Sequence, residues 1–275
     1  IGTALEGEGG TAPFVGSPFA MTNFLAQTRE NKMGTMAYVY DDTHIMGFLA
    51  SHQPTVWMGD YGYVSIMPQV GDLKVLPEDR KLKFKNENEV VSPYYYKVKL
   101  ESGPSSSIEG EIAATSRCAL FRFTYPKTEN AHLIIQGINL NPSLNDWCND
   151  LTDRLNSIEA WIKIDTVNNE IIGYNPDRHS AQLGPELSNF KGYFIIQFDK
   201  KIQDFGTWSQ DSVFSSNSEQ RGTRMGAYIS FKTKHNEKLL VRMGTSFIDI
   251  DQARKNLAHE IPHWNFMSKI LSGLI

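Results

Sequence analysis

Residues 108–125 read IEGEIAATSRCALFRFTY, which is two runs of alternating side chains joined by a short polar segment. Apolar and polar residues alternate in the first run, and Phe121, Phe123 and Tyr125 alternate with polar residues in the second. A period of two is typical of a strand with one buried face, and aromatic residues fit such a pleated surface. The stretch therefore predicts two neighbouring β-strands, the second of which ends at Pro126.

Similar runs recur along most of the chain, with turn residues between them. They are residues 94–100, 132–138, 161–165, 170–174, 193–198, 227–231 and 239–243. Short strands at this spacing, with little helix among them, are typical of two packed antiparallel sheets. We therefore expect an all-β fold, a large antiparallel β-sandwich of the supersandwich type. Residues 204–226 are rich in Ser, Gly, Asn and Gln, and this composition predicts a long exposed loop.

Helical patterns are confined to the C-terminal part of the sequence. Residues 249–260 begin with an acidic residue and carry apolar residues at helical spacing, and Pro262 stops the helix. A second amphipathic segment begins at Trp264. We expect residues 1–248 to form the sandwich and residues 249–275 to form a helical linker that leads to a further domain.

Composition excludes several classes of protein. The chain has 275 residues and a net charge of −4, and its lysines and arginines form no basic block, so a nucleic-acid partner is not expected. No apolar run approaches the roughly 18 residues of a membrane span. The two cysteines, Cys118 and Cys148, are too few for a zinc site, and a disulfide and two free thiols are both open.

Residues 51–68, SHQPTVWMGDYGYVSIMP, carry the main candidate site. A polar loop broken by proline holds Trp57 and then enters an apolar strand. An indole ring can stack on a sugar and donate from its N–H group, and His52 and Asp60 can bond hydroxyl groups or support the tryptophan. The alternative is that Trp57 fills the core and Asp60 holds a turn. A second candidate is Phe14, which follows a glycine-rich segment whose backbone can approach a ligand closely.

The segments together resemble glycoside hydrolase family 92, in colinear order and over essentially the whole chain. The motifs that carry the resemblance are IGT at 1–3, PFAM at 18–21, GF at 47–48 with His52, DYG to MP at 60–68, SPYYYKV at 92–98, ATSR to FRFTYP at 114–126, GAYISF at 226–231, VRMGTSFI at 241–248 and QARKNL to EIPHWNF at 252–266. Three departures fall in the first motifs. Ala20 replaces a glycine, Leu49 and Ala50 replace a serine and a histidine, and residues 53–56 replace the family's usual loop.

The resemblance implies the N-terminal β-sandwich of a calcium-dependent, inverting exo-α-mannosidase, in which a C-terminal (α/α)₆ barrel supplies the catalytic domain. Inversion needs two carboxyl groups about 6.5–9.5 Å apart. In this family those groups and most ligands of Ca²⁺ lie in the C-terminal domain, so we expect no catalytic residue and no metal ligand in this chain. The chain alone is expected to be inactive.

The expected partners are therefore the catalytic domain and mannose-containing glycans, and the expected location is secreted or periplasmic. Trp57, His52, Asp60 and Phe14 are the expected substrate-binding residues, on loops that rim the pocket. The alternative function is a carbohydrate-binding sandwich that acts alone without catalysis. The two differ in one observable, because the domain of an enzyme should expose an apolar face that its partner covers.

Overall fold

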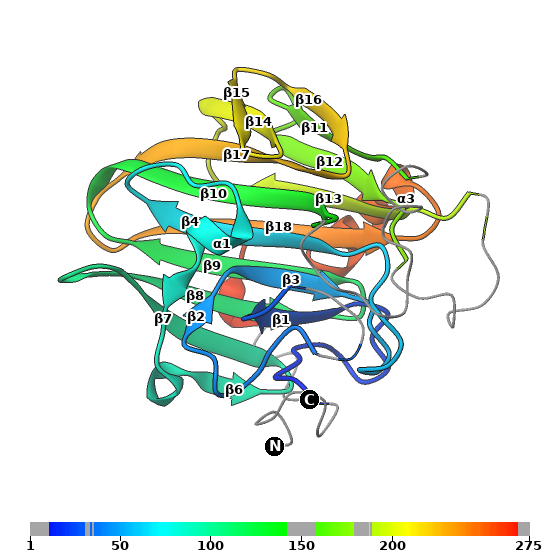
Figure 1. The fold of residues 1–275 in the computed structure, drawn as a ribbon, viewed down its shortest axis with the longest axis horizontal. Coiled ribbons are helices and arrows are strands. Elements are labelled where there is room, and N and C mark those ends of the chain that lie inside the picture. The colour runs from blue at the N-terminus through cyan, green and yellow to red at the C-terminus, as the bar shows by residue number, and fades with distance from the viewer. Residues whose placement is uncertain are drawn as a thin grey trace.

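The computed structural model describes residues 11–30, 34, 36–141, 158–178, 187 and 189–268. Within these residues the strands form two antiparallel sheets, which are the two layers of a sandwich (Figure 1). A seven-stranded sheet has the order β1-β3-β4-β10-β17-β14-β15. An eleven-stranded sheet has the order β16-β11-β12-β13-β18-β9-β8-β7-β5-β2, with β6 paired to β7. The all-β antiparallel sandwich that the sequence predicts is confirmed.

The predicted runs of alternating residues coincide with strands to within a few residues. The seven-stranded sheet contains β1 (Asn23–Gln27), β3 (Gly47–Ser51), β4 (Val64–Val70), β10 (Thr128–Asn139), β14 (Asp204–Ser209), β15 (Ser212–Ser215) and β17 (Arg224–Thr233). The eleven-stranded sheet contains β2 (His44–Ile45), β5 (Leu82–Lys83), β6 (Val90–Ser92), β7 (Tyr95–Gly103), β8 (Ser106–Ala114), β9 (Cys118–Tyr125), β11 (Ala160–Asp165), β12 (Glu170–Asn175), β13 (Gly192–Phe198), β16 (Glu219–Gly222) and β18 (Glu237–Ser246). The short helices α1 (Pro77–Arg80) and η1 (Asn86–Asn88) lie in the connections.

Aromatic residues from both sheets meet in the core between the layers. Phe24 on β1 packs edge-on against Phe121 on β9, with ring centroids 6.0 Å apart, and Phe48 on β3 lies 5.4 Å from Phe123. All four side chains are fully buried. Burying one such ring contributes roughly 1.5–3 kcal/mol, so these pairs hold the two layers together.

The predicted C-terminal helix forms as α3 (Ile250–Glu260) and packs on the outer face of the eleven-stranded sheet. Asp249 caps it by accepting a 2.6 Å hydrogen bond from the Gln252 amide. Ala253 and Leu257 are buried against β9 and β13. Helix α3 is therefore part of the packed body of the domain. The second helical segment lies largely outside the described residues, which end at 268.

The expected loop at residues 204–226 is wrong, because this segment forms β14, β15 and β16 and begins β17. Its serines, asparagines and glutamines lie in the turns and in the strands β14, β15 and β16 rather than in a structureless loop. Trp208 is fully buried, and its indole N–H donates to the Ile135 carbonyl at 3.3 Å. Gly226 lies so close that a Cβ there would sit 1.9 Å from that carbonyl, so the glycine serves strand packing.

The sandwich has two different ends. At one end, β3 leads into residues 52–63, β12 ends at Asn175 and β18 ends at Ser246, and we call this the loop end. At the other end, residues 126–127, 199–203 and 234–236 connect strands, and we call this the hairpin end. Strand β10 runs between them over 12 residues, which is about 40 Å of extended chain. The loop end is on the right in Figure 1 and the hairpin end is on the left.

Candidate functional site

His52 is buried at the loop end, directly after β3, and both of its ring nitrogens have partners. Nδ1 donates to the Tyr61 carbonyl at 2.8 Å, and Nε2 lies 2.9 Å from the Thr22 hydroxyl. The Thr22 hydroxyl is in turn 2.6 Å from that of Thr245. Burial lowers the pKa of His52, so a neutral ring accepts at Nε2. The imidazole therefore joins three segments of chain at this end.

Asp60 closes the loop that His52 begins. Its side chain is buried, and Oδ1 accepts from the His52 amide at 2.7 Å and from the Tyr61 amide at 2.8 Å. The carboxylate thus joins the first and last residues of the segment. Trp57 lies between them and is 61% exposed. A core role for Trp57 is excluded by this exposure, while Asp60 does hold the turn.

An aromatic cluster lines the inner side of this loop. Tyr61 stacks on Phe247, which follows β18, at a centroid distance of 5.6 Å. The His52 ring lies 4.7 Å from the Phe247 ring. Phe190 completes the cluster at 5.9 Å from Tyr61 and 5.7 Å from Phe247, and the guanidinium of Arg178 lies over Phe190. Three separate segments therefore meet at one apolar surface.

A close backbone contact fixes this surface to the eleven-stranded sheet. Gly62 has a φ of +61°, and a Cβ on it would sit 2.8 Å from the Cα of Gly192, at the start of β13. Only a residue without a side chain fits both requirements. Beside it, the Tyr63 hydroxyl donates to Asp177 at 3.0 Å, and Asn175 donates to the Tyr63 carbonyl at 2.9 Å. The loop is thereby held at a defined height above the sheet.

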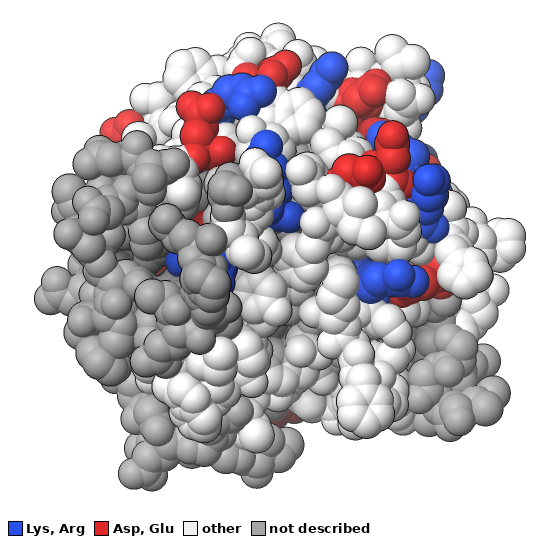
Figure 2. All heavy atoms as spheres, turned by 90° about the vertical axis from the view of Figure 1, so that its right-hand side faces the viewer, with Lys and Arg blue, Asp and Glu red and all other residues white. Residues whose placement is uncertain are grey.

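Large apolar side chains project from the loop end. Phe19 is fully exposed, Ile248 is 71% exposed and Leu187 is 60% exposed, in addition to Trp57. Phe19 belongs to this end because the neighbouring Met21 amide donates to the Ser116 carbonyl, in the turn after β8. In Figure 2, which faces this end, the charged side chains gather in the upper half, and the described residues in the lower half are largely uncharged. An uncharged surface with exposed apolar side chains is typical of a surface that binds a ligand or another domain.

The residues predicted from sequence are brought together in part. His52, Trp57 and Asp60 share one loop, and their substrate-binding role stays a prediction. Phe14 is partly buried and packs against the core between the sheets. The aromatic partners Tyr61, Phe190 and Phe247 were not predicted as site residues, although Tyr61 and Phe247 lie within motifs that carry the family resemblance. Thr22 and Thr245, which hold His52, gave no signal because they are 223 residues apart.

No group of three or more His, Cys, Asp or Glu side chains in the described part of the chain is arranged to hold a metal ion. Within the same residues no helix is long and apolar enough to cross a membrane. Cys118 is a free, buried thiol whose pKa is raised by burial, and Cys148 lies outside the described residues.

Comparison with known proteins identifies the family. The model of the glycosyl hydrolase family 92 N-terminal domain matches residues 1–246. The chain belongs to glycosyl hydrolase family 92. A solved family 92 inverting mannosidase of Bacteroides thetaiotaomicron VPI-5482 is 27% identical and superposes with a TM-score of 0.82, over 97% of this chain and 32% of that one. A second solved structure, a family 92 α-mannosidase of Bacteroides thetaiotaomicron, shares the fold at 24% identity and a TM-score of 0.78, over 99% of this chain and 35% of that one.

A curated relative of this family 92 chain is described as an uncharacterized secreted glycosidase of Arthroderma benhamiae. It is 27% identical over 97% of this chain and 35% of its own length. The chain spans about a third of the length of these relatives. It therefore corresponds to the N-terminal domain of a family of glycoside hydrolases, and four of the large apolar side chains that are exposed among the described residues lie at its loop end.

Proposed function

We propose that this chain is the N-terminal domain of a calcium-dependent, inverting exo-α-mannosidase that removes terminal α-linked mannose from glycans or mannan. A C-terminal (α/α)₆ domain would hold the catalytic carboxylates and the calcium ion, and the protein would be secreted or periplasmic. The observation that carries the proposal is the concentration of exposed apolar side chains at the loop end of a family 92 N-terminal domain. A solved relative described as an inverting mannosidase supports the substrate and the stereochemistry.

In this proposal the loop end packs on the catalytic domain and forms one rim of the substrate pocket. Trp57 stacks on the sugar that leaves, and His52 and Asp60 hold its loop in position through their buried hydrogen bonds. His52 uses both ring nitrogens on the protein, so its role is positioning. Phe14 supports the rim from the core side, where it is partly buried.

The proposal is tested by comparing residues 1–275 alone with the longer protein that would contain them. An aryl α-mannoside should be hydrolysed by the longer protein only, a calcium chelator should abolish the hydrolysis, and NMR should detect the β-anomer of mannose first, because inversion changes the configuration. Turnover by residues 1–275 alone at the rate of the longer protein would contradict the division of roles. Absence of turnover in the longer protein with added calcium would contradict the mannosidase itself.

A further inference from the structure

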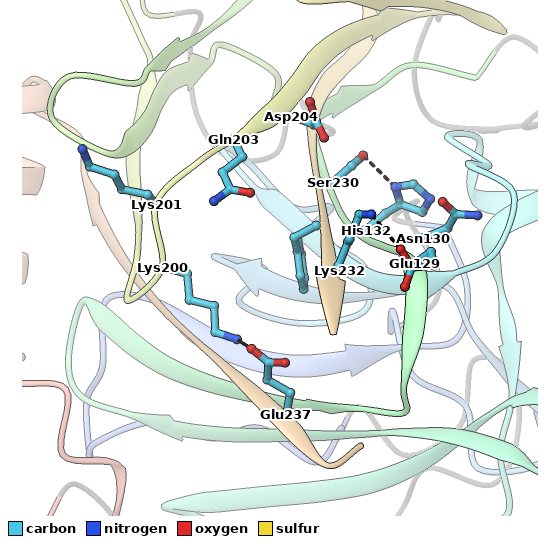
Figure 3. A pocket seen from close by; sticks show the side chains of 11 residues that line it. Glu129, Asn130, His132, Lys200, Lys201, Gln203, Asp204, Ser230, Lys232 and Glu237 are labelled. Atoms are coloured by element: carbon cyan, nitrogen blue, oxygen red, sulfur yellow. Dashed lines mark hydrogen bonds and ion pairs between the residues drawn. The ribbon is translucent and has the colours of Figure 1, made fainter. Parts of the chain in front are cut away.

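A pocket of about 520 Å³ opens at the hairpin end, far from the loop that carries Trp57. It forms where residues 199–203 cross from β13 in one sheet to β14 in the other. The start of β10, the end of β17 and the start of β18 supply the remaining wall. Figure 3 shows Lys200, Lys201 and Gln203 on one side, and Asn130 and His132 on the other. A volume of this size is in the range of small-molecule sites.

An aromatic side chain lies among the polar groups that line the pocket. Phe231 is partly buried, and the ring of Tyr125 packs edge-on against it from the opposite sheet at 5.2 Å. Tyr125 is itself fixed, because its hydroxyl donates to the His132 carbonyl at 2.9 Å. Phe231 is thus an apolar surface held in place by its neighbours, which is what stacking against a sugar ring requires.

Several polar groups around the pocket are already bonded to the protein. Nδ1 of His132 lies 2.7 Å from the Ser230 hydroxyl, and Nε2 donates to the Gly71 carbonyl at 2.9 Å. Lys200 pairs with Glu237, and Lys232 pairs with Glu129 at 2.7 Å. These side chains therefore shape the pocket, and other side chains would bind its ligand.

Four side chains at the pocket remain available within the described part of the chain. Asn130, Lys201, Gln203 and Asp204 line it, are exposed, and have no side-chain hydrogen bond or ion pair to a described residue. Together they present two amides, one ammonium and one carboxylate. Such a set can both donate to and accept from hydroxyl groups.

The positive and negative charges at the pocket are equal in number, and this balance favours a neutral ligand. Its three lysines, Lys200, Lys201 and Lys232, are balanced by three carboxylates, Glu129, Asp204 and Glu237. An anion or a nucleic acid would require an excess of positive charge. A neutral ligand with many hydroxyl groups and one apolar face fits the pocket better, and a neutral sugar has these properties.

We propose that the pocket bounded by Phe231, Asn130, Lys201, Gln203 and Asp204 is a secondary binding site for neutral carbohydrate, separate from the loop end. It would hold a polysaccharide chain on the domain while the other end of the molecule engages the terminal sugar. The choice of mannan as its ligand rests on the proposed function, whereas the existence of the site does not.

Affinity electrophoresis of the longer protein tests the site, in gels that carry yeast α-mannan and in gels that carry xylan. The double variant Gln203→Ala/Asp204→Ala removes two ligand-bonding groups. Its dissociation constant should rise by about fivefold or more relative to the unsubstituted protein, in the gel that causes retardation. The control Asn88→Ala/Glu101→Ala removes one exposed amide and one exposed carboxylate outside the pocket, and should migrate with unchanged retardation.

Equal retardation of the pocket variant and the control, or no retardation in either gel, would overturn the site. Retardation by xylan alone that the pocket variant loses would uphold a neutral-sugar site and replace mannan as its ligand. Phe231→Leu, which keeps an apolar side chain and removes the ring, should weaken retardation without lowering the melting temperature by more than a few degrees. Hydrolysis of an aryl α-mannoside by the same proteins reports the proposed function separately, and the pocket variant should retain it.

Discussion

The two ends of the sandwich use polar and apolar groups in opposite ways. At the loop end the polar side chains are buried and bonded to one another, as His52 and Asp60 are, while Trp57 and Phe19 project outward. At the hairpin end the ring of Phe231 lies partly buried beside polar side chains that face solvent. The first arrangement suits a rigid surface that another domain covers, and the second suits direct contact with a soluble ligand.

Two glycines give the sharpest contrast in stability between the ends. Gly62 and Gly71 both have positive φ, of +61° and +88°, but only Gly62 has another backbone within 3 Å of a Cβ. Gly62→Ala should therefore lower the free energy of unfolding by about 4 kcal/mol, from backbone strain plus overpacking. Gly71→Ala should cost only the strain, about 1 kcal/mol. Denaturant unfolding measures both, and equal losses would mean that the contact between Gly62 and Gly192 is not tight.

Two carboxylates extend the contrast from backbone to side chains. Asp60→Ala leaves the amides of His52 and Tyr61 buried without this acceptor, and should cost about 3 kcal/mol. Asp204→Ala at the hairpin end removes an exposed carboxylate and should stay within about 0.5 kcal/mol of the original stability. Thermal melting is sufficient to compare them. A stable Asp60→Ala variant would show that the loop carrying Trp57 is held by something else.

Much of the fold was accessible from the sequence, and the limits of the prediction have physical causes. Alternation predicted the strands, and the acidic cap with the following proline predicted α3, because both signals are local. The prediction of a loop at residues 204–226 failed because polar composition conceals short strands around the buried Trp208. The sequence predicted site residues within one segment, residues 52–60, and at Phe14, which the structure places against the core. The residues Thr22, Phe190 and Phe247, which contact this segment, come from distant parts of the chain. Only the folded structure shows that they lie beside it.

The buried histidines at the two ends should make the stability of the domain depend on pH. Burial lowers the pKa of His52 and of His132 below the ordinary value of 6.5, although Asp60 and the Tyr61 carbonyl oppose the shift at His52 and the Gly71 carbonyl opposes it at His132. Below pH 6.5 the unfolded chain therefore binds protons that the folded chain does not. The free energy of unfolding should fall as the pH is lowered from 6.5 towards the folded-state values.

The variants His52→Gln and His132→Gln should each make this decline shallower, since each removes one of the protonating groups. Denaturant unfolding at pH 7.5 and pH 5.5 measures the difference in slope for each end of the sandwich. If the decline is as steep in both variants as in the original protein, buried carboxylates rather than these histidines control it.

The role of the loop end in binding substrate is tested most directly through Trp57, in the longer protein. Trp57→Ala should lower kcat/KM for an α-linked mannobiose by about tenfold, the loss of roughly 1.4 kcal/mol of aromatic contact, and should change kcat/KM for an activated aryl α-mannoside much less. Its melting temperature should not change, because the side chain is 61% exposed. The matched control Phe214→Ala removes a 43% exposed ring on β15 and should leave both substrates unaffected. Equal impairment on both substrates, or none on either, would contradict the assignment of the loop end as the rim of the mannoside pocket.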